Sequence, residues 1–185
     1  MTKECRVRRF FADGNEKEDT DVLAKENSGL MAHEFDLGFR FCNDQEKAHS
    51  DNPGKRYNPE ELSRRITNCM EEFLDFSDNS KKTGALHLAA LFDGEKFSFF
   101  AEDVSRHNAI YKAIGACLER NETPDKYILF SSGRITLSVL ELADSAGIRT
   151  IVSKGAVSFE AAEKAKEEGM DLYGFASDKR VNYYG

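Results

Sequence analysis

The sequence contains no tryptophan, only three prolines, and four cysteines among its 185 residues. The cysteines are Cys5, Cys42, Cys69 and Cys117, and no two of them form a CxxC pair. Their spacing therefore gives no indication of a zinc knuckle or of a redox-active dithiol. Cys69 and Cys117 fall within helical patterns, which favours thiols that are buried as small apolar side chains.

Long apolar runs are also missing, so the sequence predicts no membrane-spanning helix. The first residues, MTKECRVRRFF, lack the apolar core and the small-residue cleavage site of a secretory signal. We therefore expect a cytoplasmic protein without a membrane partner, in which disulfides are not expected.

Positive charge is in short supply, because 26 lysines and arginines stand against 33 aspartates and glutamates, a net charge of −7. Sequence-independent binding of nucleic acid needs a broad basic face, so this balance argues against a nucleic-acid partner. A small basic pocket on an acidic surface stays compatible with it. With 40% hydrophobic residues, the chain can bury the core of one domain of ordinary size.

The first 57 residues differ in pattern from the rest. In this N-terminal segment, residues 1–57, we predict two short strands at 5–11 and 33–41 and a long mobile loop. The charged stretch 13–29 shows little periodicity, and we expect it to be a mobile excursion.

A helix is predicted to begin at Asn58, which has the side chain of an N-cap and is followed by Pro59 at the first helical position. Its apolar stripe consists of Leu62, Ile66, Cys69 or Met70, and Phe73.

Strands and helices alternate from residue 84 onward. A hairpin of 84–92 and 96–101 around Asp-Gly-Glu is followed by predicted helices at 105–120, 135–146 and 158–168 and strands at 127–131, 149–153 and 172–176. This order predicts that residues 58–185 form an α/β domain with a mixed, mostly parallel sheet and helices on both faces.

Cationic side chains occur in each of the four segments that follow predicted strands. In a parallel sheet these segments meet at one edge, where ligands bind beside helix N-termini. The cations are Arg106, His107, Arg134, Lys154, Lys179 and Arg180. We expect the N–H groups of Ser132 and Gly133 to face the ligand as well. A ring of positive potential on an acidic protein favours a compact polyanion such as a nucleotide.

A plainer interpretation of the same residues is that they are helix caps and solvated charges, as in the loops of any α/β protein. His87 lies among apolar neighbours of a predicted strand, a place where a histidine is more often a satisfied core residue than a ligand.

Several familiar chemistries are not supported. The chain has no Walker A loop, no G-x-G-x-x-G after a strand and no G-x-S-x-G elbow. Zinc-dependent base deamination needs H-x-E and P-C-x-x-C, whereas His107 is followed by Asn108 and Ala109 and no cysteine follows the next strand. No metal site is therefore predicted, and an enzyme acting on another nucleotide stays a weaker alternative.

Four blocks, TGALHLAAL, EDVSRHNAIYKAIG, SSGRITLSV and LYGFASDKRVNYY, resemble in order and spacing the FdhD family of formate dehydrogenase accessory proteins. The resemblance implies a cytidine-deaminase-like α/β fold without zinc and a homodimer. It also implies binding of the molybdopterin guanine dinucleotide cofactor of molybdenum or tungsten, which a guanine nucleotide can mimic. Sulfur from a cysteine desulfurase would reach this cofactor before its insertion into formate dehydrogenase.

The family's binding segment at the end of the chain maps onto Phe175, Ala176, Ser177, Asp178, Lys179 and Arg180. With Asp103, Arg106, His107, Ser132, Gly133 and Arg134, these residues form the expected cofactor site. Arg106, Arg134 and Arg180 would neutralise phosphates, Phe175 would pack on the base or pterin, and Asp103 would orient Arg106 or cap a helix.

The sequence departs from the family pattern at Ala85, Ser105, Tyr111, Ser138 and Val157, and it lacks the family's CxxC loop. Cys42 lies where that loop is expected and is the candidate sulfur carrier, although Asp44 and Glu46 would raise the pKa of its thiol. Two hypotheses therefore stay open: a sulfurtransferase that uses Cys42, and a degenerate paralogue that binds the cofactor without transferring sulfur.

Overall fold

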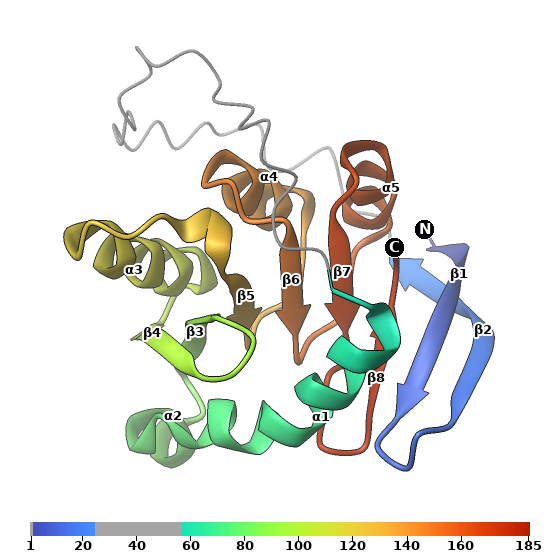
Figure 1. Ribbon diagram of the computed structural model, residues 1–185, viewed down its shortest axis with the longest axis horizontal. Coiled ribbons are helices and arrows are strands. Elements are labelled where there is room, and N and C mark those ends of the chain that lie inside the picture. Colours follow the sequence, from blue (N-terminus) through green and yellow to red (C-terminus); the bar gives the residue numbers. More distant parts are fainter. Residues whose placement is uncertain (1, 25–56) are drawn as a thin grey trace.

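Residues 2–24 and 57–185 are described by the computed structural model, in which a single sheet is packed between helices (Figure 1). The helices are α1 (Pro59–Asp75), α2 (Asp78–Thr83), α3 (Arg106–Glu119), α4 (Leu137–Ser145) and α5 (Phe159–Glu168). The strands are β1 (Thr2–Phe11), β2 (Glu16–Ala24), β3 (His87–Phe92), β4 (Phe97–Asp103), β5 (Ile128–Ser131), β6 (Thr150–Ser153), β7 (Asp171–Gly174) and β8 (Arg180–Tyr183).

The eight described strands follow the order β2-β1-β8-β7-β6-β5-β3-β4. Only the β5–β6 and β6–β7 pairs are parallel, and the other pairs of described strands are antiparallel. The sheet is therefore mixed, as expected, but the prediction that it is mostly parallel is wrong. The expected hairpin is confirmed, with its turn held by Asp93, which accepts hydrogen bonds from the N–H groups of Glu95 and Lys96 at 2.8 and 2.9 Å.

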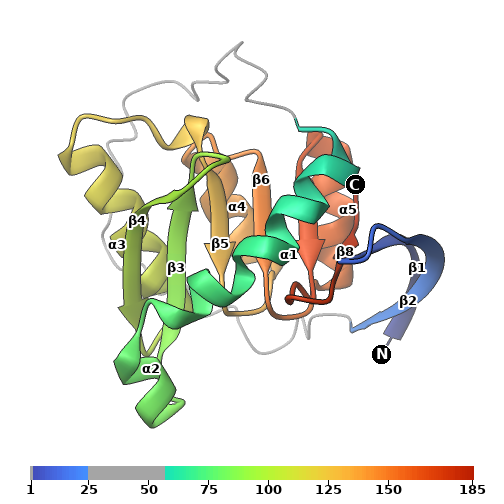
Figure 2. The same cartoon turned by 60° about the horizontal axis from the view of Figure 1, so that its bottom comes forward.

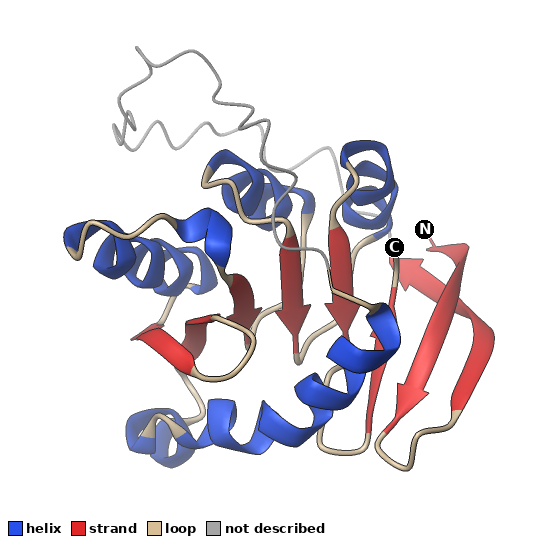
Figure 3. Cartoon of the chain, in the orientation of Figure 1, coloured by secondary structure: helices blue, strands red, loops and turns tan. Residues whose placement is uncertain are grey.

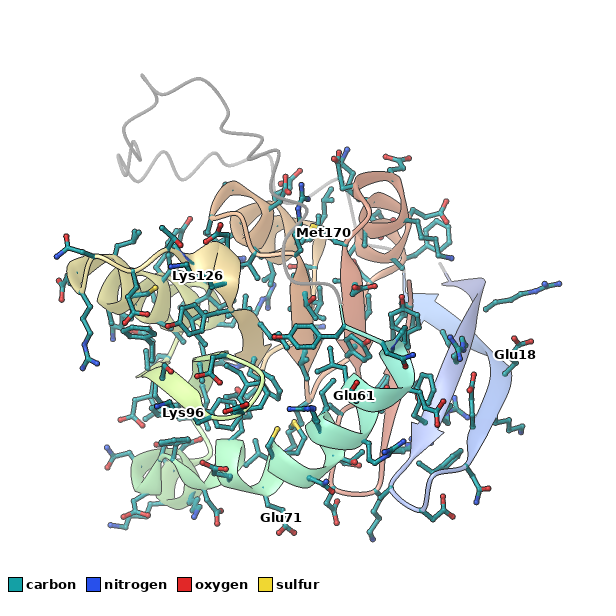
Figure 4. All side chains as sticks on the ribbon, in the orientation of Figure 1. Glu18, Glu61, Glu71, Lys96, Lys126 and Met170 are labelled. Atoms are coloured by element: carbon teal, nitrogen blue, oxygen red, sulfur yellow. The ribbon has the colours of Figure 1, made fainter. Side chains whose placement is uncertain are left out.

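Two apolar clusters pack against the sheet. One contains buried residues of α3, α4 and α5 together with alternate strand residues such as Leu91, Leu129 and Ile151. The other contains the buried face of α1 and the intervening residues, such as Phe130 and Val152. This alternation follows the two-residue period of a strand, and Figure 2 shows α1 lying across the strands. Charged residues such as Glu71 on α1 and Glu18 on β2 point away from the protein body (Figure 4).

The first helix begins where the sequence predicts, because its local signals are complete. Asn58 accepts hydrogen bonds from the N–H groups of Glu60 and Glu61 at 3.0 and 3.3 Å, and Pro59 occupies the first turn. The expected stripe is buried in Leu62, Ile66, Met70 and Phe73, whereas Cys69 is only half-buried.

Three described elements differ from the sequence prediction. Residues Glu16–Ala24 form β2, paired with β1, and not a mobile excursion; as an edge strand it carries charges on both faces and so lacks a hydrophobic period. Residues Arg180–Tyr183 form β8, after a turn in which Ser177 Oγ accepts the N–H groups of Lys179 and Arg180 at 3.1 and 3.2 Å. The six-residue α2 was not predicted. The strand expected at 33–41 and Cys42 lie outside the described residues.

No helix among residues 2–24 and 57–185 is long and apolar enough to cross a membrane.

Candidate anion-binding site

The expected binding loops do meet at one edge of the sheet. β4, β5, β6 and β7 all run in the same direction, although β3 lies between β4 and β5, because β3 is antiparallel to both. Their carboxyl ends therefore share an edge with the first residues of β3 and β8, as the arrowheads of β5, β6 and β7 in Figure 3 show. His87, the first residue of β3, joins this edge.

Hydrogen bonds tie the loops after β5, β6 and β7 to one another. Ser153 Oγ donates to the carbonyl of Gly133 and accepts from the N–H of Gly155 at 2.8 Å. The N–H of Phe175 donates to the carbonyl of Gly155 at 2.9 Å, and the N–H of Ala176 donates to the carbonyl of Ser153 at 2.9 Å. Ser153 is completely buried. These bonds make the three loops one rigid rim.

Two glycines let the loops approach so closely. A Cβ on Gly133 would lie 2.9 Å from Arg106 Cβ and 3.4 Å from His87 Nδ1. A Cβ on Gly155 would lie 3.0 Å from the backbone nitrogen of Arg134 and 3.1 Å from the carbonyl carbon of Gly133. The rim therefore also brings Arg106, from the first turn of α3, against the loop after β5.

An open depression of about 610 Å³ lies between this rim and the α1–α2 corner. Ser132, Lys154 and Gly155 line the rim side, and His87 lines it from the start of β3. The opposite wall consists of Leu74, Asp75, Ser80, Lys81, Gly84 and Leu86. Lys81 Nζ pairs with Asp75 Oδ1 at 2.7 Å, so this wall is nearly neutral.

Three cations of the rim have no such carboxylate partner among residues 2–24 and 57–185. Within the described part of the chain, the side chains of Arg134, Lys154 and Arg180 make no hydrogen bond or ion pair, and all three residues are exposed. Asp178 adds one exposed carboxylate to the same turn as Arg180. The net result is an edge of positive charge on a protein whose overall charge is −7.

Two of the expected site residues interact with the helices instead of facing the depression. Asp103 accepts hydrogen bonds from the N–H of Ser105 at 2.9 Å and from Lys112 Nζ at 2.6 Å. The pKa of Asp103 is lowered, first by Lys112 and then by Ser105. His107 Nε2 lies 3.0 Å from Ser138 Oγ and so links α3 to α4. Asp103 therefore holds the turn that leads into α3, but it accepts no backbone N–H group of the helix itself, so its expected role as a helix cap is not confirmed.

The expectation that Ser132 and Gly133 offer free N–H groups is wrong. The N–H of Ser132 donates to the carbonyl of Leu88 at 2.9 Å, and the N–H of Gly133 donates to Ser131 Oγ at 3.1 Å. Both bonds replace strand pairing just beyond the end of β5, before α4 begins at Leu137. Contacts to an anion at this point must therefore come from side chains.

The turn after β7 combines strain with exposure. Phe175 has a φ of 51° and its side chain is 38% exposed, although an aromatic residue rarely adopts positive φ. The bonds from the N–H groups of Phe175 and Ala176 to the loop after β6 hold it in this conformation. Ala176 is buried, and Lys179 is exposed.

Sequence reasoning missed His87 as a site residue. The half-buried imidazole lies beside Gly133 and Arg106 and makes no hydrogen bond within the described residues. Burial, followed by the charges of Arg106 and Arg134, lowers the pKa of His87. The signal that was available is its place at the start of a strand that runs opposite to its neighbours, which puts it at the ligand edge.

Cys69 and Cys117, the two cysteines whose side chains the structure describes, are poor nucleophiles. Burial, together with Glu72, raises the pKa of Cys69 to about 12. Cys117 is fully buried, and burial also raises its pKa. Cys42 lies outside the described residues.

Residues 12–185 match the FdhD/NarQ family. The chain is 36% identical over 121 residues to the sulfur carrier protein FdhD of Staphylococcus haemolyticus, an alignment that covers 65% of this chain and 46% of that protein. It is 41% identical over 123 residues to the sulfur carrier protein FdhD of Wolinella succinogenes, covering 65% of this chain and 42% of that protein. The aligned region is thus less than half the length of these relatives.

The fold is also similar to a crystal structure from Desulfotalea psychrophila, described as that of a formate dehydrogenase accessory protein. The TM-score is 0.64 at 20% sequence identity, and the match covers 100% of this chain and 96% of the other. The likeness at this identity concerns the fold alone. Because the family match extends over nearly the whole sequence, the chain belongs to the FdhD/NarQ family.

Proposed function

We propose that this chain binds the guanine-dinucleotide form of the molybdenum or tungsten cofactor and carries sulfur to it during the maturation of formate dehydrogenase. The binding part is supported by Arg134, Lys154 and Arg180, three cations at one edge of the sheet that have no carboxylate partner among the described residues, on a protein of net charge −7. Guanidinium and ammonium groups without carboxylate partners are available to phosphates, and an arginine can bind a phosphate with two hydrogen bonds.

The residues present fit such a cofactor. Its diphosphate groups suit the rim cations, and its rings suit the exposed face of Phe175, which the loop bonds hold in one orientation. The cofactor, when bound, supplies the metal centre that receives the sulfur. The protein supplies the rigid rim, so little conformational entropy is lost on binding.

The sulfur-carrying step is assigned to Cys42. Cys69 and Cys117 are unsuitable because burial keeps both as thiols. In this assignment the Cys42 thiolate attacks the outer sulfur of a persulfide on a cysteine desulfurase. A new S–S bond forms on Cys42, and the desulfurase cysteine leaves as a thiolate. The same proposal includes a homodimer, a cytidine-deaminase-like fold and docking to formate dehydrogenase, in line with the accessory role of the family.

Calorimetry with GDP, which carries the guanine and diphosphate of the cofactor, tests the binding part. Arg134→Ala and Arg180→Ala should each weaken GDP binding roughly tenfold or more, and the double variant should abolish it. Lys126→Ala is the matched control, because it removes an exposed cation just before β5, at the opposite edge of the sheet (Figure 4). Unchanged affinity in the double variant would overturn the site.

A second candidate is a cofactor-binding module without sulfur transfer, and the missing CxxC pair favours it. Incubation with a cysteine desulfurase and ³⁵S-cysteine separates the two candidates. Label that is retained by the wild type, lost in Cys42→Ala and kept in Cys117→Ala supports transfer through Cys42. A protein that binds GDP but takes up no label is the binding module.

A further inference from the structure

His87 occupies a position between the depression and the cations of the rim. Its Nδ1 lies 3.4 Å from the place where a Cβ on Gly133 would stand, and Arg106 packs against the same glycine. The residue also lines the depression beside Ser132 and Lys154. The imidazole makes no hydrogen bond within the described part of the chain. A half-buried ring with open donor and acceptor sites is uncommon for a purely structural histidine.

The charged and titratable groups around His87 are mostly positive. Among the described residues these groups are Asp103 from β4, Arg106 from α3, Arg134 and Lys154 from the rim, Lys81 from α2 and Asp75 from α1. The two carboxylates are already occupied, Asp103 by Lys112 and Asp75 by Lys81. Burial together with Arg106 and Arg134 lowers the pKa of His87, so the ring is neutral near pH 7 in the free protein.

An anion in the depression changes this balance. The positive charges of Arg106 and Arg134 disfavour the imidazolium form of His87, and the negative charge of the anion offsets them. The anion also accepts a hydrogen bond from the ring. We propose that His87 is an anion-binding residue that takes up a proton from solvent when a phosphate group binds and then donates to that group. This inference rests on the proposed function. It means that binding of the anion is accompanied by the uptake of one proton.

The protonation balance is simple. Free protein with neutral His87, one anionic ligand and one solvent proton give a complex with imidazolium, and no covalent bond of the ligand changes. Binding must therefore tighten as pH falls from about 8 to about 6, over the range in which a histidine titrates. A neutral ligand such as guanosine provides no charge and takes up no proton.

Calorimetry of GDP binding in two buffers with different ionisation enthalpies measures the proton uptake. At pH 7 the wild type should take up a measurable fraction of a proton beyond that taken up by His87→Gln. The variant serves as control for GDP itself, whose terminal phosphate titrates near pH 6, about where other phosphate groups do. His87→Gln should bind GDP roughly tenfold more weakly at pH 6.5 and nearly as well as the wild type at pH 8.5.

Wild-type protein gives a second, independent readout by NMR. The sequence has only four histidines, so the His87 ring signal is assigned by its loss in His87→Gln. Its midpoint of titration should rise when GDP is added and stay in place with guanosine. Equal proton uptake by both proteins, or an unmoved His87 midpoint in the GDP complex, overturns the role of His87 while the cation site stands. If GDP does not bind the wild type, both the proposed function and this inference fail.

Discussion

Glu102 and Asp103 are consecutive residues of β4, yet their carboxylates hold different helices. Glu102 accepts hydrogen bonds from Ser77 Oγ and from Asn79 Nδ2 at the start of α2. Asp103 accepts the N–H of Ser105 at the start of α3. Neighbouring strand residues face opposite sides of a sheet, so one acidic pair fixes elements on both sides of the candidate site.

The first prediction concerns α2, which has no buried residue and depends on polar contacts. Glu102→Ala should release this helix from β4 while the core stays folded. Trypsin should then cleave after Lys81 or Lys82 several-fold faster than in the wild type, because local opening exposes the backbone. Glu95→Ala, which removes an exposed carboxylate in the β3–β4 turn, is the control and should leave the cleavage rate unchanged.

The same contact predicts a pH dependence. Hydrogen bonds from Ser77 and then Asn79 lower the pKa of Glu102 below its ordinary value of 4.5. Because the folded pKa is depressed, the attachment of α2 is complete above pH 4.5 and is lost as pH falls through the lower, folded value. Cleavage at α2 by an acid-active protease should rise in this range in the wild type but stay high and flat in Glu102→Ala. A flat wild-type profile would contradict the assignment.

The close approach of the rim loops predicts that replacing two different glycines by alanine has opposite effects on the free energy of unfolding. Gly155→Ala forces a Cβ to 3.0 Å from the Arg134 backbone, and this overpacking should lower the free energy of unfolding by about 1–3 kcal/mol. Gly115→Ala, within α3 and without any atom near the added Cβ, should raise it by about 0.8–1.0 kcal/mol. Urea unfolding measures both, and a neutral Gly155→Ala would mean that the loops are not in contact.

A comparison of two phenylalanine variants tests the aromatic cluster between α1 and the sheet. Phe73 is completely buried, with ring centroids of Phe97 and Phe130 at 5.8 and 5.6 Å, so Phe73→Ala should cost about 3–5 kcal/mol of unfolding free energy. Phe76 is 44% exposed and stacks on Phe100 at 4.5 Å, and Phe76→Ala should cost only about 0.5–1.5 kcal/mol. Thermal unfolding of both variants measures these losses. A larger loss in Phe76→Ala than in Phe73→Ala would contradict the placement of Phe73 at the centre of the cluster.

Thiol reactivity provides the last prediction. With its pKa raised to about 12, Cys69 is ionised in only about one molecule in 10,000 at pH 8, against about a quarter for an ordinary thiol. Iodoacetamide should therefore leave Cys69 and buried Cys117 unmodified in the native protein and alkylate both in urea. Peptide mass spectrometry reads the sites directly, and fast native alkylation of Cys69 would remove the argument that assigns sulfur transfer to Cys42.

Local signals determined how far the fold could be predicted. Asn58, Pro59 and the apolar stripe after them specify α1 within a few residues, so its start is confirmed. β2 has no such signal, because Glu16–Ala24 is rich in charge and is held mainly by backbone pairing with β1. β8 depends on the Ser177 turn, whose side-chain hydrogen bonds reverse the chain without a glycine.

The candidate site, too, was predictable only where the sequence carries a clear signal. The gathering of the rim loops followed from strand direction alone and is confirmed by the bonds of Ser153 and Gly155. The N–H groups of Ser132 and Gly133 were assigned wrongly, because their partners Leu88 and Ser131 depend on the exact end of β5. His87 could not be found from its apolar neighbours, which are typical of a core residue and do not indicate that its Nδ1 lies 3.4 Å from the place of a Cβ on Gly133.

The pairing of β1 with β8 joins Arg8–Phe11 to Arg180–Tyr183, nearly the full length of the chain apart. Contacts of such long range carry the largest loop-closure cost and tend to form late in folding. The turn that carries Phe175 lies directly before β8, and Arg180 is the first residue of β8, so the final geometry of both depends on that late step. A partly folded chain in which β1 and β8 have not yet paired therefore lacks the final geometry of this edge.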